Sequence, residues 1–251
     1  MNETILTRRN LLGTAVAGIV AAAAGTAEAQ ERQRRREGGA RSQGDPFERR
    51  ERIVPSFGNA QFYKDGKFDE NAAKDAVIAL CRYHRYPVFP DFKEKLWVSD
   101  YGIGKFTEVG LAAIMVANNR REGSSYMLQE LFLLPNQMLP EHWHVKGGAD
   151  KDGPQKDEGW FVRYGRSYVI GEGEPNLPPE IAVPASHGDV TVKHAVVADP
   201  GTFVPLGPLG SHHWQFAGKE GVILSEVANY HSNACVRHQN KTANDTFLKG
   251  I

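Results

Sequence analysis

Residues 140–144 read Pro-Glu-His-Trp-His, and Glu158 and the pair His212–His213 follow further along the chain. In an extended strand the side chains at positions i and i+2 point to the same face, so His142 and His144 are expected to face one side of a sheet. Imidazole nitrogens together with a carboxylate form a ligand set for a divalent metal ion. The stretch therefore predicts a metal site inside a β structure.

Short apolar or alternating runs surround this stretch from residue 87 onward, and each is bounded by Gly, Pro, Asn or Asp, as strands joined by turns are. The expected strands are 110–116, 126–134, 160–164, 167–170, 190–192 and 221–227. Many short strands without alternating helices predict an all-β sandwich or barrel rather than a nucleotide-binding sheet. One helix is expected over 69–80, packed outside the sheet.

The fourth metal ligand is one of two adjacent histidines. Counting along the chain from Gly201 without a gap selects His212. His212 would then share one face of the strand with Trp214 and Phe216, as expected of a strand that lines an apolar cavity. Counting from the Pro208-x-Gly210 turn selects His213 instead. We favour His212, because the period-two pattern uses more residues, and keep His213 as the alternative.

The N-terminal residues 1–29 have the form of a twin-arginine export signal. Arg8 and Arg9 precede an apolar run of Ala and Gly, and Ala27-Glu28-Ala29 supplies the small residues of a cleavage site. The apolar run is shorter than the roughly 20 residues that span a bilayer, so no stable membrane span is expected after cleavage. We expect export to the periplasm or the extracellular space.

Residues 30–55 hold many arginines among Gly, Gln and Glu and have almost nothing apolar to bury, so a disordered linker is expected. No nucleic-acid partner is expected, since Glu residues dilute the charge and no aromatic residues interleave with the arginines. Residues 56–251 suit a single domain. Cys81 and Cys235 would meet an oxidising compartment that permits a disulfide, but two unpaired thiols are the simpler expectation.

The order of the metal motifs resembles the cupin superfamily, whose small double-sheet barrels hold a metal between a His-x-His and Glu segment and a later His. Gly165 follows Glu158 as in the Glu-x6-Gly part of that pattern, and residues 147–155 form an insert of turn composition. The resemblance implies a cupin-type double-stranded β-helix (jelly-roll) barrel with a flanking N-terminal helix. The implied metal ligands are His142, His144, Glu158 and His212, or His213 in place of His212.

Within the cupins, the chain resembles the D-lyxose isomerases over roughly residues 90–240. Residues 97–102 resemble the family's Val-Thr-Asp-Phe-Gly, and residues 156–158 its Lys-x-Glu. Residues 225–227 resemble its Gly-Glu-Val-Ser. The order and spacing of these segments together are fairly specific to that family.

Two stretches differ from the D-lyxose isomerases. The family continues from its Gly-Glu-Val-Ser into an acidic Asn-Asp-Asp cluster, whereas residues 229–233 here read Asn-Tyr-His-Ser-Asn. A lysine expected in the strand before the metal segment is replaced near Gln129 and Glu130. The other histidines have no ligand context and are expected to be structural or at the surface: His84, His187, His194, His231 and His238.

The resemblance implies a manganese-dependent aldose–ketose isomerase that interconverts a small-molecule sugar such as lyxose or mannose with its ketose. The metal would polarise the sugar carbonyl, and a base would move a proton between two carbons through an enediolate. Glu226 and Lys156 are the candidate catalytic residues, although Glu226 could instead cap a strand end and Lys156 could lie solvated in the insert.

Two alternative functions use the same barrel. One is an iron-dependent oxygenase with this ligand set, and the other is a non-catalytic carbohydrate-binding cupin, which the missing acidic cluster favours. A homodimer that associates through sheet edges is the expected assembly.

Overall fold

The computed structural model describes residues 53–121, 124–147 and 155–249. The expected export signal lies outside the described residues, as does the expected linker up to residue 52, and residues 53–55 have no regular secondary structure. No helix in the described part of the chain is both long and apolar enough to cross a membrane. The predicted division of the chain into signal, linker and domain stays a prediction.

Strands outnumber helices in the domain. In chain order the elements are η1 (Asn59–Phe62), β1 (Tyr63–Lys64), β2 (Lys67–Phe68), α2 (Glu70–His84), α3 (Phe92–Lys95), β3 (Trp97–Ser99), β4 (Leu111–Asn119), β5 (Tyr126–Leu133), β6 (Met138–His144), β7 (Glu158–Gly171), β8 (His194–Ala198), β9 (Phe203–Pro205), β10 (His213–Ala228), η2 (Asn233–Cys235), β11 (Val236–His238) and α4 (Lys241–Lys249).

The expected N-terminal helix is α2. The side chain of Asp69 accepts a hydrogen bond from the backbone N–H of Ala72 at 3.1 Å, which caps the helix start. Its buried face includes Ala73, Val77 and Leu80, at helical spacing. The helix continues past the predicted end to His84, and Arg85, in the left-handed conformation with φ of 58°, ends it.

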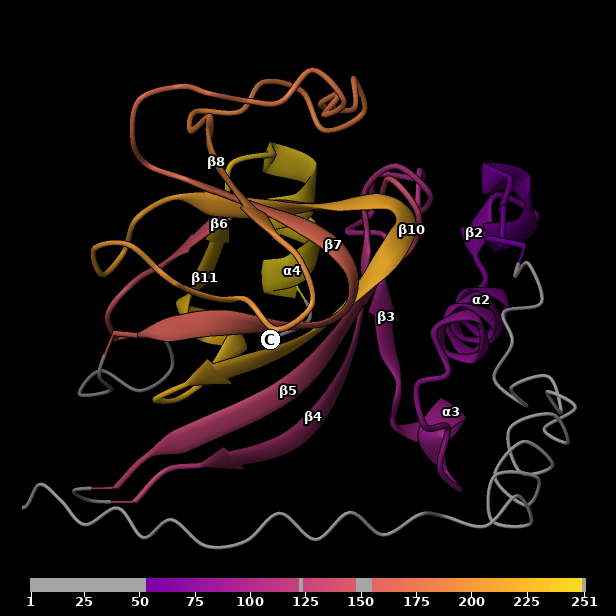
Figure 1. Ribbon diagram of the computed structural model, residues 1–251, viewed down its shortest axis with the longest axis horizontal. Helices are drawn as coiled ribbons and strands as arrows, with labels where there is room; N and C mark the ends of the chain where they lie inside the picture. The colour runs from indigo at the N-terminus through magenta and orange to yellow at the C-terminus, as the bar shows by residue number, and fades with distance from the viewer. Residues whose placement is uncertain (1–52, 122–123, 148–154, 250–251) are drawn as a thin grey trace, which may run out of the picture. The chain divides into compact units, whose positions relative to one another are not determined.

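One antiparallel sheet of nine strands forms the body of the domain. Its main order is β11-β6-β10-β5-β4-β3, and β7 pairs with β10, β8 and β9. The sheet curls into an open barrel, with α2 and α3 outside β4 and β5 and with α4 near β11 and β6 (Figure 1). The predicted all-β barrel with a flanking N-terminal helix is therefore confirmed.

The long strands β7 and β10 pair with each other along most of their length and bend at the same place. On its other edge, β10 pairs with β6 before the bend and with β5 after it. Gly165 and Gly221 lie at this bend with φ of 74° and 72°. A Cβ added at Gly165 would lie 2.0 Å from the carbonyl oxygen of Gly221, so the close approach of the two backbones at the bend requires glycine at position 165.

Both faces of the curled sheet are covered by apolar residues. Inside the barrel, Trp160, Leu131 and Leu224 belong to one buried cluster. A second cluster packs α2 against the outer face of β4 and β5, and a third packs residues 181–195 against the outer face of β7 and β10. An apolar side chain on these strands therefore does not by itself identify the inner face.

Two strand predictions are corrected by the structure. The predicted strands 160–164 and 167–170 form one continuous strand, β7, because Gly165 bends the chain without breaking its pairing with β10. Residues 190–192 are not a strand, and the nearest strand, β8, begins at His194. Thr191 instead donates its backbone N–H to the carboxylate of Glu141 at 2.7 Å. This side-chain acceptor takes the place of the backbone carbonyl of a neighbouring strand.

Cys81 in α2 and Cys235 in η2 are both buried and unpaired, so the expectation of two separate thiols is confirmed.

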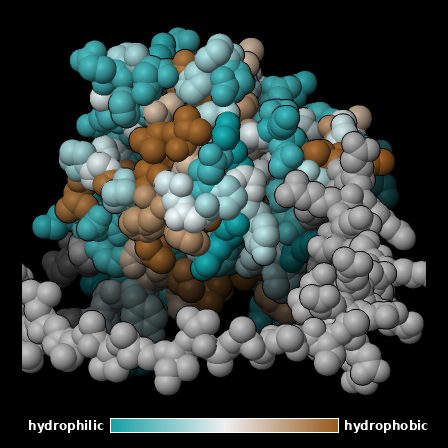
Figure 2. Space-filling model, viewed as in Figure 1, coloured by the Kyte–Doolittle hydropathy of each residue, from teal (hydrophilic) through white to brown (hydrophobic). Residues whose placement is uncertain are grey.

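Figure 2 shows hydrophobic residues gathered between hydrophilic ones on the face that it displays. Exposed large hydrophobic residues on β8 and β9 include Val197 and Phe203. The expected homodimer stays a prediction.

Candidate metal centre and active site

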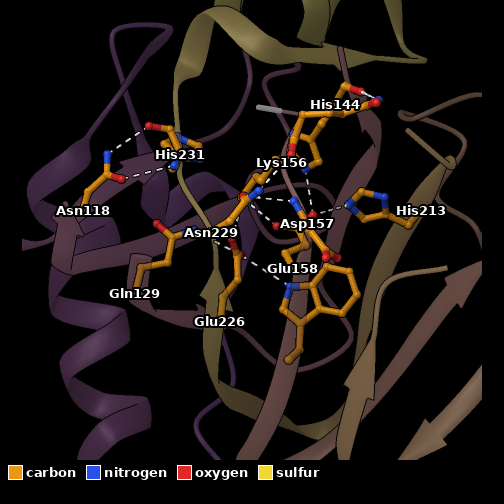
Figure 3. Close-up of polar contacts among 12 residues, drawn as sticks. Asn118, Gln129, His144, Lys156, Asp157, Glu158, His213, Glu226, Asn229 and His231 are labelled. Carbon is orange, nitrogen blue, oxygen red and sulfur yellow. Dashed lines mark hydrogen bonds and ion pairs between the residues drawn. The ribbon is translucent and has the colours of Figure 1, made fainter. Parts of the chain in front are cut away.

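Four buried side chains meet inside the barrel: His142 and His144 from β6, Glu158 from the start of β7 and His213 from the start of β10. Their candidate ligand atoms all lie within 4.8 Å of one another. The i, i+2 spacing directs both β6 histidines inward, and direct pairing of His213 with His142 brings the third imidazole to the same face. Figure 3 shows His144, His213 and Glu158 converging.

Hydrogen bonds orient two of the imidazoles. Nδ1 of His142 lies 2.9 Å from the carbonyl oxygen of Pro140, and Nδ1 of His213 lies 3.0 Å from that of Ser211. A carbonyl oxygen only accepts, so each Nδ1 carries the hydrogen and, in the neutral ring, each Nε2 presents a lone pair. This arrangement is the one that metal-binding histidines use.

The lone pair of His213 faces another acceptor. Its Nε2 lies 3.1 Å from Oε1 of Glu158, and the same oxygen lies 2.7 Å from Nε2 of His144. An unprotonated nitrogen and a carboxylate oxygen repel each other in a buried site, and a cation between them removes the repulsion. The donor set and its packing therefore fit a divalent metal ion.

The protonation states also suit a metal. Burial lowers the pKa of His142 well below its usual value, with His213 and His144 contributing, and burial lowers the pKa of His144 to about 4. Burial alone would raise the pKa of Glu158, but the charge of Lys156 and contacts with His144 lower it well below its usual value. Neutral imidazoles and an ionised carboxylate are the forms that bind metal.

The structure does not bring His212 into this group, which corrects the preferred choice, and His213 takes the place. The His212 ring is stacked on Trp143, with 4.2 Å between ring centroids, and its Nδ1 lies 2.8 Å from Oε1 of Glu141 on the other face of the sheet. Trp214 and Phe216, which favoured His212, pack in the cluster outside the barrel. The period-two pattern correctly placed His212, Trp214 and Phe216 on one face of the strand. Because both faces of β10 carry apolar residues, the pattern did not show that this face lies outside the barrel.

Lys156 and Glu226 lie beside the metal group. The ammonium nitrogen of Lys156 is 2.5 Å from Oε2 of Glu158 and 2.5 Å from Oε1 of Glu226. Although burial would lower the pKa of Lys156, the charges of Glu158 and Glu226 raise it, so the side chain is a cation. Lys156 is 5 % exposed and therefore not a solvated residue of the insert. Asp157, which lies between Lys156 and Glu158 in the sequence, is exposed.

Glu226 has hydrogen-bond donors on its second oxygen. Oε2 accepts from Nε2 of Gln129 at 3.1 Å and from Nε1 of Trp160 at 3.4 Å. Figure 3 shows Gln129 beside Glu226. Burial raises the pKa of Glu226 to about 7, although Lys156 acts to lower it. A carboxylate with a pKa near neutrality can both take and return a proton.

A cavity of about 480 Å³ opens onto this group. His142, His144, Lys156 and Glu226 contribute to its wall. Its other polar lining residues are Asn118, Gln129, His231, Ser232, Asn233 and His238, and its aromatic ones are Trp97, Tyr101 and Phe247. The volume lies within the range of small-molecule sites.

Comparison with known proteins identifies the family. No protein-family model matches the chain. A D-lyxose ketol-isomerase from Cohnella laeviribosi is 35% identical over 158 residues, which cover 62% of this chain and 82% of that protein. The chain belongs to the D-lyxose ketol-isomerase family. A D-lyxose/D-mannose isomerase from Thermosediminibacter oceani is 34% identical over 62% of this chain and 83% of its own length.

The fold of this D-lyxose ketol-isomerase family member is similar to that of a solved L-ribose isomerase from Cellulomonas parahominis. The TM-score is 0.54 and the sequence identity 17%, over 70% of this chain and 93% of that one. The predicted resemblance to D-lyxose isomerases, the cupin fold and the enzyme class, an aldose–ketose isomerase, are thus confirmed.

The sequence pattern does not identify several cavity residues of this family member. His231 and His238 were expected to be structural or at the surface, yet both line the cavity. Strand β11 is three residues long, which is too short to show an alternation of apolar and polar residues. The sequence around His238 therefore does not indicate that its side chain points inward. Gln129 did have one, because it shares the inner face of β5 with the buried Leu131.

Proposed function

We propose that this chain is a metal-dependent isomerase that interconverts D-lyxose with D-xylulose, or D-mannose with D-fructose, through a sugar enediolate. The relatives named above carry the names D-lyxose ketol-isomerase and D-lyxose/D-mannose isomerase. The observation that carries the proposal is that a candidate metal group and a carboxylate with a near-neutral pKa share one cavity and are joined by Lys156.

His142, His144, Glu158 and His213 would hold the metal. Manganese is the ion we propose, because the resemblance to the D-lyxose isomerases implies it. When bound, such an ion polarises the sugar carbonyl and acidifies the neighbouring C–H bond. The chain supplies the rest of the chemistry, namely the base, the charge that balances the enediolate and the walls that orient the sugar.

Glu226 is the proposed base. It takes the proton from C2 of the aldose, the electron pair of that C–H bond forms the C1–C2 double bond of the enediolate, and the π electrons of the carbonyl move to the oxygen on C1. The proton of the C2 hydroxyl then passes to the oxygen on C1. Glu226 returns its proton to C1 as the C2–O bond becomes the carbonyl, which gives the ketose. Its burial and its pKa near 7 make it basic enough to accept a carbon-bound proton and acidic enough to release it.

Lys156 is the proposed electrostatic partner rather than the base. Its raised pKa keeps it protonated, so it has no lone pair with which to abstract a proton. A fixed ammonium group in a buried site stabilises negative charge that develops on the enediolate oxygens. Gln129 and Trp160 hold the other oxygen of Glu226 in place.

The test is ketose formation by the manganese-loaded protein from D-lyxose and D-mannose, followed by chromatography. We expect Glu226→Gln to abolish turnover while manganese still binds, because the amide cannot accept the proton. Glu130→Gln is the matched control, since Glu130 is buried on the outer face of the same sheet and accepts a hydrogen bond from Ser225 at 2.7 Å. Full activity of Glu226→Gln, or none in the wild type loaded with metal, would refute the proposal.

We also propose that the protein is exported by the twin-arginine route and acts in the periplasm or outside the cell. The support is the sequence around Arg8 and Arg9. Replacing both arginines with lysine should leave the protein in the cytoplasmic fraction, and unchanged export of that variant would overturn the proposal.

A further inference from the structure

His238 stands in register with two of the candidate metal ligands. It pairs with His142 across β11 and β6, and His142 pairs with His213 across β6 and β10. Residues directly opposite each other in antiparallel strands share a face, so the three imidazoles line one side of the sheet. His238 is nevertheless outside the group whose ligand atoms lie within 4.8 Å of one another.

The His238 ring is held rigidly in the cavity wall. Its ring centroid lies 5.1 Å from that of Tyr101 and 5.0 Å from that of Phe247 in α4. Its backbone N–H donates to Oδ1 of Asn244 at 3.1 Å. The side chain is only 5 % exposed. Helix α4 and the aromatic rings therefore fix both the backbone and the ring, which gives the imidazole a defined direction.

Neither ring nitrogen of His238 has a hydrogen-bond partner among the described residues, and Nδ1 is buried without one. Buried polar atoms are nearly always paired, so an unpaired one calls for a reason. Because Nδ1 is enclosed and the side chain lines the cavity, the ring edge that meets the cavity carries Nε2.

The unpaired nitrogen of His238 suits a hydroxyl group. In the neutral imidazole one ring nitrogen donates and the other accepts, and the tautomer decides which. A hydroxyl group both donates and accepts, so it can form a hydrogen bond with Nε2 in either tautomer.

We propose that His238 is a substrate-binding residue whose Nε2 forms a hydrogen bond with one hydroxyl of the aldose, and that it contributes to the choice of sugar. The proposal rests on the proposed function, since it takes an open-chain aldose or ketose as the ligand of the cavity. A site built to hydrogen-bond a hydroxyl discriminates strongly against a ligand that lacks it.

The experiment measures binding rather than turnover. The manganese-loaded protein is titrated by calorimetry with D-arabinitol, the polyol obtained by reducing D-lyxose, which cannot isomerise, and with its singly deoxygenated derivatives. The variants are His238→Phe, which keeps the ring and removes both nitrogens, and His238→Gln, which keeps a donor near the position of Nε2. His194→Gln is the control. His194, at the start of β8, is not among the residues that line the cavity, and its Nδ1 lies 2.8 Å from the carbonyl oxygen of Glu174.

We expect His238→Phe to weaken polyol binding by about 10- to 100-fold, as for one lost buried hydrogen bond, and His238→Gln to restore most of it. One deoxygenated derivative should bind the wild type more weakly by a similar factor, with no further loss in His238→Phe. Manganese affinity should stay within about threefold of the wild type in every variant. If His238→Phe does not fold, His238→Leu makes the same comparison.

Three results would overturn the proposal. The first is polyol binding unchanged in His238→Phe, and the second is a parallel loss of manganese affinity, which would place His238 in the support of the metal group. The third is a metal-loaded wild type that neither binds the polyol nor converts any aldose, since then the proposed function fails as well. Ketose formation by the wild type with unchanged polyol binding in His238→Phe would overturn the His238 assignment alone.

Discussion

The ammonium nitrogen of Lys156 lies 2.5 Å from Oε1 of Glu226, and only 6% of either side chain is exposed. The same nitrogen lies 2.5 Å from Oε2 of Glu158, so one buried cation joins the candidate metal group to the proposed base. Without it, two carboxylates would stand in the same buried space with no compensating charge inside the chain.

Replacing Lys156 with methionine should destabilise the metal-free protein by about 3–5 kcal/mol, because removing one partner leaves uncompensated buried charge. The free energy of unfolding in urea measures this. Lys93→Met is the matched control, since Lys93 also lies 2.5 Å from a carboxylate oxygen, of Asp75, but with side chains 36% and 64% exposed. The control should cost no more than about 1 kcal/mol. Equal losses in the two variants would contradict the account.

His213 and His212 offer a direct comparison of the two adjacent histidines. His213→Gln should lower manganese affinity by more than about 100-fold, since even residues that only orient metal ligands are worth about 10- to 100-fold. His212→Gln should leave the affinity within a few-fold, because His212 bonds Glu141 on the other face. Metal titration followed by fluorescence or calorimetry distinguishes them, and the reverse order of effects would restore His212 as the ligand.

Asn118 connects β4 to residues 229–233 at the edge of the cavity. Its Nδ2 donates to the carbonyl oxygen of His231 at 2.9 Å, and its Oδ1 accepts from the backbone N–H of His231 at 3.1 Å (Figure 3). Asn118→Ala should raise KM several-fold and change the free energy of unfolding by no more than about 1–2 kcal/mol, since two exposed hydrogen bonds are lost.

The neighbouring Asn119→Ala is the control for Asn118, because the amide nitrogen of Asn119 has no partner in the described part of the chain. It should leave KM unchanged. Equal KM values in the two variants would show that the link to His231 does not shape the cavity.

Buried histidines should make the metal-free protein less stable in acid. The pKa of His238 is lowered from 6.5 to about 3 by burial, so between these values the unfolded chain binds a proton that the folded chain does not. Stability is therefore fully present above about pH 6.5 and falls as the pH decreases, by up to about 1.4 kcal/mol per pH unit for one such group.

Urea unfolding in the presence of a chelator, at pH values from 7 to 4, measures this slope. His238→Phe should reduce the slope by about one proton relative to the wild type. Glu226, whose raised pKa acts with the opposite sign, is present in both proteins and cancels in the comparison. Parallel pH profiles would mean that His238 is not held neutral in the folded state.

The sequence alone allows several local features to be predicted. Asp69 marks the start of α2 because capping depends on residues close in sequence. The spacing of His142 and His144 places both on one face because strand periodicity is a local property. Glu158 can be predicted as a metal ligand despite the insert at residues 147–155, because a loop of turn composition can be added between two strands without displacing them.

Other features depend on contacts between distant segments. Whether His212 or His213 faces inward depends on the pairing of β10 with β6, which includes a register shift just after His213. The inward position of His238 depends on the pairing of the three-residue strand β11 with β6, which places His238 opposite His142. Neither the register shift nor this pairing leaves a local signal in the sequence.

The most direct test of the account follows deuterium. The manganese-loaded protein is incubated with D-lyxose in deuterated water, and NMR measures deuterium at C2 of the recovered aldose. Transfer by Glu226 through an enediolate predicts incorporation at C2 together with ketose formation, both lost in Glu226→Gln. A metal-loaded protein that forms ketose without solvent deuterium, or that leaves D-lyxose unchanged and unlabelled, would contradict it.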